Sequence, residues 1–251
     1  MLGDLTYRRK GDVGEMGIVI ACMIIALWAG HLVWSLLFAP LDAASPLLYI
    51  HIVIQTYLST GLFITAHDAM HGAVARSSTV NTLIGRTCSM LYAFLSYARL
   101  RNNHVRHHSA PGTDGDPDYS TRSQLFFLWW FTFMRHYATV MQVIGMAVIY
   151  NILHIWFGDL RLWILWVLPL FASTFQLFSF GTYERHRLPH TKEMQPHNSR
   201  TLMPNHAWAM LSCYFFGYHH EHHSSPRTPW WKLHTLKRTK RPGSSAANPG
   251  H

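Results

Sequence analysis

The sequence predicts an all-α membrane protein with four transmembrane helices, additional interfacial or re-entrant helices, and a histidine-rich metal site at one face of the membrane. Only 13% of the 251 residues are charged, whereas a soluble domain carries about 25%. Apolar residues make up 49% of the chain, which excludes a disordered protein. The 19 histidines concentrate in segments that alternate with long uncharged runs.

Four uncharged runs are long enough to cross the hydrocarbon as helices, which takes about 20 residues. They cover residues 16–41, 43–66, 136–158 and 162–183. Two shorter uncharged stretches, residues 87–98 and 123–134, are expected to form interfacial or re-entrant helices. We expect residues 1–240 to form a single integral-membrane domain. Residues 241–251 lack apolar periodicity and are expected to form a flexible tail.

The basic residues predict the orientation of these helices. If the four runs cross in alternation, 20 of the 21 Lys and Arg fall on one side and only Arg161 lies opposite. The positive-inside rule then assigns the basic side to the cytoplasm. The net charge of +9 therefore lies against the membrane lipids, and no nucleic-acid partner is expected.

Three histidine clusters are the candidate chemical site. They lie at residues 67–71 (H-D-A-M-H), 104–108 (H-V-R-H-H) and 219–223 (H-H-E-H-H). Positions i, i+3 and i+4 share one face of a helix, so each cluster can present its imidazoles to a metal. The predicted topology puts all three clusters on the basic side, provided that residues 80–97 do not cross the bilayer.

Eight imidazoles lie on these helix faces, and His220 lies off them. The eight are His67, His71, His104, His107, His108, His219, His222 and His223. Because one zinc ion takes four ligands, or three and a water, eight suit two metal ions with four or five ligands each. Imidazole binds Zn, Cu, Fe and Ni, so ligand type leaves the metal open.

The alternatives to a redox metal pair are a zinc hydrolase and a metal transporter. A zinc peptidase needs H-E-x-x-H, but position 68 is Asp. A transporter usually binds its cargo near the middle of the bilayer, whereas these clusters lie at one face. A redox-active metal pair that acts on a lipid-soluble substrate agrees better with the sequence.

Four stretches carry a family resemblance. They are L-F-I-T-A-H-D-A-M-H-G at 62–72, the second cluster followed by D-P-D at 116–118, F-G-T-Y at 180–183 followed by His186, and C-Y-F-F-G-Y at 213–218 before the third cluster. In this order they resemble the motifs of bacterial carotenoid 4-ketolases, in the membrane fatty-acid desaturase and hydroxylase superfamily. The similarity spans residues from about 60 to 235.

The resemblance implies an O₂-dependent di-iron oxygenase that converts the C4 methylene of carotenoid β-ionone rings to a ketone by two hydroxylations and a dehydration. It implies two Fe(II), O₂ as co-substrate, electrons from a reduced carrier protein such as ferredoxin, and a carotenoid that enters from the bilayer. It also implies a bacterial plasma membrane, with the active site on the cytoplasmic side. A ring hydroxylase or a fatty-acyl desaturase on the same scaffold is the nearest alternative.

The resemblance further implies a ninth metal ligand, His186, although Glu184-Arg185 stands where the family has Leu-Pro. Metal-bound histidines usually donate their other N–H to a carboxylate or carbonyl. We therefore predict four catalytic-site carboxylates beside the ligands, with surface ion pairs as the alternative role. They are Asp68, Asp116, Asp118 and Glu221. The histidines inside the spans, His31, His51 and His154, are expected to form hydrogen bonds within the bundle.

Overall fold

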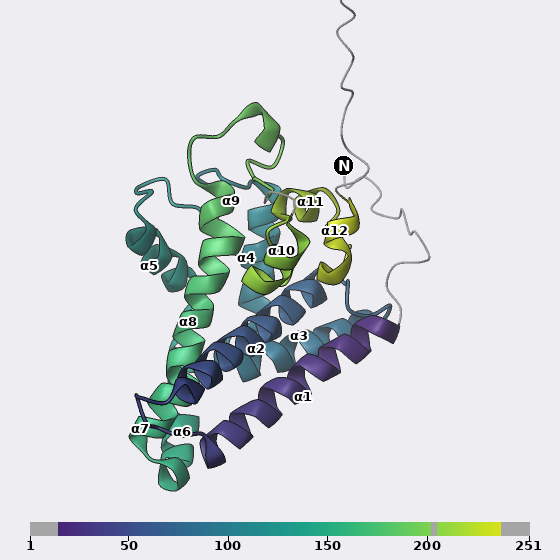
Figure 1. The fold of residues 1–251 in the computed structure, drawn as a ribbon. Coiled ribbons are helices and arrows are strands. Elements are labelled where there is room, and N and C mark those ends of the chain that lie inside the picture. Colours follow the sequence, from purple (N-terminus) through teal and green to yellow (C-terminus); the bar gives the residue numbers. More distant parts are fainter. Residues whose placement is uncertain (1–14, 202–204, 237–251) are drawn as a thin grey trace, which may run out of the picture.

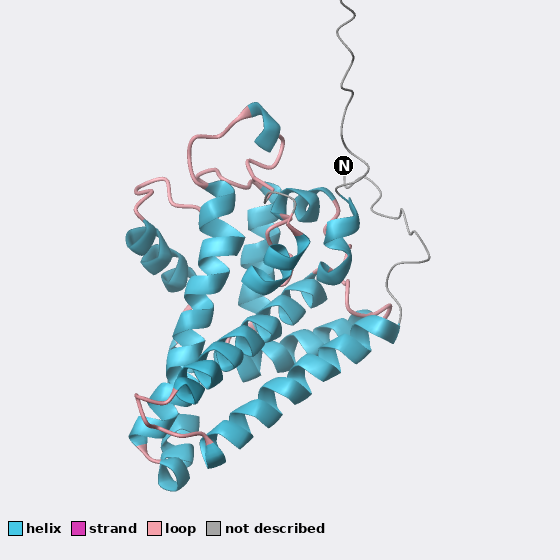
Figure 2. Cartoon of the chain, in the orientation of Figure 1, coloured by secondary structure: helices cyan, strands magenta, loops and turns pink. Residues whose placement is uncertain are grey.

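The structure, a computed structural model, describes residues 15–201 and 205–236, and every regular element there is helical (Figure 2). The predicted tail, residues 241–251, lies outside the described residues. The long helices converge at one end of the molecule and diverge toward the other, where the short helices gather (Figure 1). The predicted fold class is confirmed.

Four helical segments are long and apolar enough to span a membrane, as predicted. They are α1 (Glu15–Phe38), α2 (Pro46–Met70), α6 (Val140–Phe157) and the continuous segment Asp159–His186. The third begins later than expected because Ala138 is extended and separates α5 (Phe126–Tyr137) from α6. Thr139 then caps α6 by accepting a hydrogen bond from the backbone N–H of Gln142 at 3.1 Å.

The fourth span contains two π-helical turns. Its parts are α7 (Asp159–Leu162), η1 (Trp163–Val167), α8 (Leu168–Leu177), η2 (Phe178–Tyr183) and α9 (Glu184–His186). The first π turn lies just before Pro169, which has no N–H and whose ring would collide with the carbonyl four residues earlier in a regular α-helix. The second contains the F-G-T-Y motif and ends one residue before α9, which carries His186. Such turns often occur at functional sites.

The segment between the second and third spans leaves the histidine-rich end and returns to it. Helix α3 (Ser78–Ala93) packs along α2, and Phe94, with φ of 53°, ends it in the left-handed conformation. Helix α4 (Tyr97–Ser109) then carries the second histidine cluster back (Figure 1). This path agrees with the expectation that residues 80–97 do not cross the bilayer.

The remaining described elements follow the fourth span. They are η3 (Lys192–Met194), α10 (His206–Cys213), α11 (His219–Ser224), η4 (Trp230–Lys232) and α12 (Leu233–Leu236). Helices α10, α11 and α12 lie beside α4 and above the end of α2 (Figure 1). All three histidine clusters therefore reach the same end of the bundle.

The three histidines inside the spans find partners, as expected. His31 Nδ1 lies 2.6 Å from Gln55 Oε1, and its Nε2 lies 3.2 Å from His51 Nδ1. At the opposite end from the histidine clusters, His154 Nε2 lies 3.4 Å from Asp159. At that end Arg161 donates to the carbonyls of Ser35 and Ala39 at 3.1 and 2.9 Å, so the basic residue on this side caps α1.

Candidate metal centre

The last turn of α2 brings His67, Asp68 and His71 to the histidine-rich end. The rings of His67 and His71 lie one turn apart, with centroids separated by 4.9 Å. Asp68 is buried, and its carboxylate accepts a hydrogen bond from the backbone N–H of Trp230 at 2.9 Å. Its other oxygen lies 3.4 Å from His67 Nδ1. Asp68 thus joins the end of α2 to the C-terminal segment and limits the orientation of His67.

A tight aromatic turn positions the third cluster. Tyr214 and Phe215 follow α10 with φ of 45° and 58°, a left-handed conformation that costs non-glycine residues free energy. Gln176 Nε2 and Tyr57 Oη donate to the carbonyls of Ser212 and Met210, both at 2.7 Å, and hold the end of α10 against the spans. The turn places α11, and its histidines, over the end of the bundle.

The nine predicted histidines form two groups of converging ring nitrogens. The first imidazole group is His67, His71, His104, His108 and His222. The second imidazole group is His107, His186, His219 and His223. Within each group the ligand atoms all lie within 4.8 Å of one another. The structure therefore brings together all nine histidines that the sequence nominated, including His186.

Each H-x-x-H-H cluster is divided between the two groups. On α4, His104 and His108 join the first group while His107 joins the second; on α11, His219 and His223 join the second while His222 joins the first. The reason is helical geometry: i and i+4 differ by about 40° around the axis, and i+3 lies about 100° from i+4. Each H-x-x-H-H cluster therefore contributes imidazoles to both groups, and its three histidines do not lie along one stripe as expected.

The spacing of the nitrogens fits metal coordination. Nε2 of His71 and His104 lie 2.7 Å apart, and Nε2 of His108 and His222 lie 3.0 Å apart. In the second group, Nε2 of His223 lies 3.1 Å from Nε2 of His107 and also from that of His219. Two nitrogens bound at right angles, each about 2.1 Å from one ion, would lie about 3 Å apart.

Four buried ring nitrogens in these groups have no hydrogen-bond partner within the described residues. They are Nε2 of His67 and His186, and Nδ1 of His219 and His223. A buried polar atom without a partner costs about 1–3 kcal/mol, and a metal bond would remove that cost. The donor set, with such nitrogens in both groups, therefore fits two metal ions.

Burial keeps most of these imidazoles neutral, the form that binds metal. Burial, reinforced by neighbouring imidazoles, lowers the pKa of His71 to about 3 and that of His108 to about 2. It also lowers the pKa values of four more histidines well below the usual range. These are His104, His219, His222 and His223.

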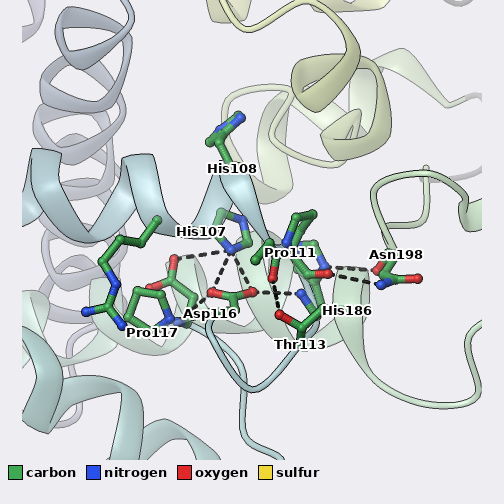
Figure 3. A network of polar contacts seen from close by, with 12 residues as sticks. His107, His108, Pro111, Thr113, Asp116, Pro117, His186 and Asn198 are labelled. Atoms are coloured by element: carbon green, nitrogen blue, oxygen red, sulfur yellow. Dashed lines mark hydrogen bonds and ion pairs between the residues drawn. The ribbon is translucent and has the colours of Figure 1, made fainter. Parts of the chain in front are cut away.

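His107 is oriented by a buried carboxylate (Figure 3). Its Nδ1 lies 2.9 Å from both oxygens of Asp116, which also accept from the backbone N–H groups of Gly112 and Asp118 at 2.8 Å. Burial alone would raise the pKa of Asp116, but His107 and these N–H donors lower it overall. Burial alone would lower the pKa of His107, but Asp116 raises it overall. With Nδ1 bound to Asp116, Nε2 points at the second group.

His186 is oriented by a backbone carbonyl. Its Nδ1 lies 3.0 Å from the oxygen of Asn198, in the loop after the fourth span (Figure 3). Since a carbonyl only accepts, Nδ1 carries the proton and Nε2 presents a lone pair. The Asn198 side chain donates to the Pro111 carbonyl at 3.0 Å, which ties this loop to the loop after α4. Sequence reasoning missed Asn198, because a carbonyl oxygen has no sequence signature.

The other predicted carboxylates differ in position. Asp118 is buried, accepts a hydrogen bond from the hydroxyl of Tyr137, and lies 3.9 Å from His107 Nδ1. Burial raises the pKa of Asp118 to about 6, against the opposing charge of His107. Glu221 instead accepts a hydrogen bond from the hydroxyl of Thr201. His220, set aside from the ligands, lies with Nδ1 3.2 Å from the Ser199 carbonyl.

An apolar cavity of about 580 Å³ ends at the metal centre. His67 and His104 of the first group and His107 and His219 of the second line it at one end. Along the last span the lining runs from Thr182 to Trp163, about 28 Å of helix. The other wall is α6, none of whose residues is buried.

Four apolar spans, nine clustered imidazoles and an apolar cavity define an integral membrane protein whose two histidine groups fit a pair of metal ions. The sequence pattern of the fatty acid desaturase family matches residues 43–153 and 135–250. The chain belongs to the fatty acid desaturase family.

Three relatives with assigned activities are similar over most of this chain. A β-carotene ketolase from Paracoccus sp. strain N81106 is 36% identical over 89% of this chain and 93% of its own length. Another β-carotene ketolase, from Paracoccus sp. strain PC1, is 34% identical over 94% of this chain and 98% of its own. A zeaxanthin 4-ketolase from Chlamydomonas reinhardtii is 35% identical over 96% of this chain and 56% of its own.

Proposed function

We propose that the protein is a β-carotene ketolase that oxidises the C4 methylene of β-ionone rings to a ketone. The single observation that carries the proposal is the apolar cavity that ends at both imidazole groups. A carotene is a long hydrocarbon without polar groups, and such a cavity suits it. The similarity to two ketolases over nearly their whole lengths supports the same substrate.

The nine histidines would hold two Fe(II) ions, five ligands on one and four on the other. Bound iron would supply the redox chemistry that activates O₂, which zinc does not offer. Asp116 would fix the tautomer of His107 and direct its Nε2 toward the metal. The Asn198 carbonyl would do the same for His186. Asp68 would do the same for His67 through its buried contact.

The proposed reaction balances over two rounds. In each, one oxygen atom of O₂ enters a C–H bond at C4 and the other leaves as water, with two electrons from a carrier protein such as ferredoxin and two protons. The second round gives a geminal diol, which loses water to form the ketone. The protein holds the ring and keeps bulk water out of the cavity during both rounds.

The substrate would enter sideways from the bilayer. Helix α6, which forms one wall of the cavity, is packed only lightly against the rest of the protein and has no buried residue. We place the protein in a bacterial plasma membrane with the metal centre on the cytoplasmic side. The basic residues of α4, at the metal end, support this orientation, and Arg161 lies at the opposite end.

Expression in cells that make β-carotene tests the proposal. Pigment analysis should reveal echinenone, with one ketone ring, and canthaxanthin, with two, only in the presence of O₂. The variant His107→Ala is the matched negative control. Unchanged carotenoids from active membranes would overturn the ketolase proposal. Hydroxylated rings without ketones would indicate a ring hydroxylase, and new acyl double bonds a desaturase.

A further inference from the structure

Gln142 presents an unpaired polar atom to an otherwise apolar cavity. It is the third residue of α6, and its side chain lines the cavity wall. Its Oε1 is buried and has no hydrogen-bond partner within the described residues. Since an unpaired buried acceptor costs about 1–3 kcal/mol, such a group in a cavity wall calls for a ligand that supplies the donor.

Other polar side chains in the same wall have partners within the protein. The hydroxyl of Tyr137 donates to Asp118. Tyr150 donates to Asp159 at 2.7 Å, and Thr174 donates to the Phe171 carbonyl at 2.8 Å. These groups are already occupied, whereas the Gln142 acceptor is available to a ligand.

The first turn of α6 lies at the metal end of the cavity. Arg99 Nε and Asn103 Nδ2, on α4, donate to the carbonyl of His136 at 2.7 and 3.3 Å. His104, the next residue of α4, belongs to the first imidazole group. Tyr137 follows His136 and reaches Asp118 beside His107. The residues just before this turn therefore connect to the centre, and Gln142 follows five residues after Tyr137.

We propose that the Gln142 carboxamide accepts a hydrogen bond from a hydroxyl group on the substrate ring. The proposal rests on the proposed function. After the first oxidation the ring is a secondary alcohol, and the second must remove the remaining hydrogen from the same carbon. That step consumes O₂, two electrons from the carrier and two protons, and yields the geminal diol and water. A hydroxyl held by Gln142 turns the remaining C–H toward the metals.

The ring hydroxyl that Gln142 would bind can come from two sources. The hydroxyl is either the alcohol formed in the site or one already present on an incoming ring, as in zeaxanthin. A positioning residue for the alcohol intermediate changes the partition between alcohol and ketone, whereas a residue that only supports the fold lowers all products together. The ratio of products therefore separates the two roles.

The test compares Gln142→Leu with wild type in cells that make β-carotene and in cells that make zeaxanthin. Losing one net hydrogen bond of about 0.5–1.5 kcal/mol should raise the ratio of 4-hydroxy to 4-keto rings from β-carotene by about two- to thirteenfold. A fall of the same size in zeaxanthin ketolation would mean that Gln142 also holds the pre-existing hydroxyl. Gln142→Glu keeps an acceptor of equal length and should restore the partition to within about twofold of wild type.

Asn151→Leu is the matched control, because Asn151 lies on α6, is exposed, and donates only to the Ala147 carbonyl at 2.8 Å. It should leave both ratios unchanged. If Gln142→Leu accumulates poorly, Gln142→Met makes the same comparison. An unchanged ratio and unchanged zeaxanthin turnover would overturn the role of Gln142. Absence of ketones from wild type would instead overturn the proposed function, so the two failures are distinguishable.

Discussion

Nδ1 of His107 lies 2.9 Å from each carboxylate oxygen of Asp116, and both residues are buried. This contact fixes which nitrogen of His107 faces the second imidazole group. We expect Asp116→Asn to keep the fold and to weaken metal binding about 10- to 100-fold, because an amide loses the charge that orients the ring. Metal retained during dialysis against a chelator measures the effect.

The control for this change is Asp114→Asn. Asp114 is exposed and lies two residues away on the same loop. Its variant should retain metal as wild type does. Equal retention by Asp116→Asn and wild type would mean that His107 needs no carboxylate.

Gly181, in the second π turn, allows Phe216 to approach the cavity wall. A Cβ at this position would lie 3.0 Å from the Phe216 ring, so the ring would have to shift by a few tenths of an ångström. Both residues line the cavity. We expect Gly181→Ala to lower turnover about tenfold by displacing the substrate, while metal content stays unchanged.

Gly30→Ala is the matched control, since a Cβ there meets nothing within 4 Å. Pigment yield per mole of protein and metal analysis together make the measurement. If Gly181→Ala lost metal instead of turnover alone, the π turn would act on His186 rather than on the cavity.

The metal-free protein should lose stability in acid. Burial lowers the pKa of His71 to about 3 and that of His108 to about 2, whereas unfolded histidines titrate near 6.5. As pH falls below about 6.5, the unfolded chain therefore takes up protons that the folded protein does not, and the free energy of unfolding falls. His107, whose pKa Asp116 raises, acts in the opposite direction.

Thermal unfolding of chelator-treated protein in detergent checks this prediction. The midpoint should fall steadily from pH 8 to pH 5. The double variant His71→Ala, His108→Ala should have a shallower slope. A midpoint that rises toward acid pH would contradict buried neutral imidazoles.

His31 supports the membrane bundle far from the metal centre. Its replacement by Ala removes the partner of Gln55, which is 1% exposed, and leaves a buried amide unpaired. We expect His31→Ala to lower stability by about 1–2 kcal/mol and to reduce yield, with turnover per mole of folded protein unchanged. Loss of metal in this variant would mean that the two ends of the bundle are coupled.

The sequence was sufficient to predict the four spans, the gathering of the three clusters and, through the family resemblance, His186. The lengths of the uncharged runs predicted the spans, and the positions of Lys and Arg predicted that the clusters lie on one side. The division of adjacent residues between groups was not predictable, because whether His107 or His108 faces a given ion depends on how α4 crosses α2 and α11. The break at Ala138 was also missed, since an apolar run does not reveal a change in backbone direction. Asn198 acts through its carbonyl, which any residue provides.

Metal analysis of the purified protein tests the central claim, two ions held by nine imidazoles, most directly. Iron should be present at about two ions per chain. His186→Ala, from the second group, and His71→Ala, from the first, should each lower it, whereas His154→Ala should not. One tightly bound zinc ion per chain, with activity that persists without O₂, would contradict the account.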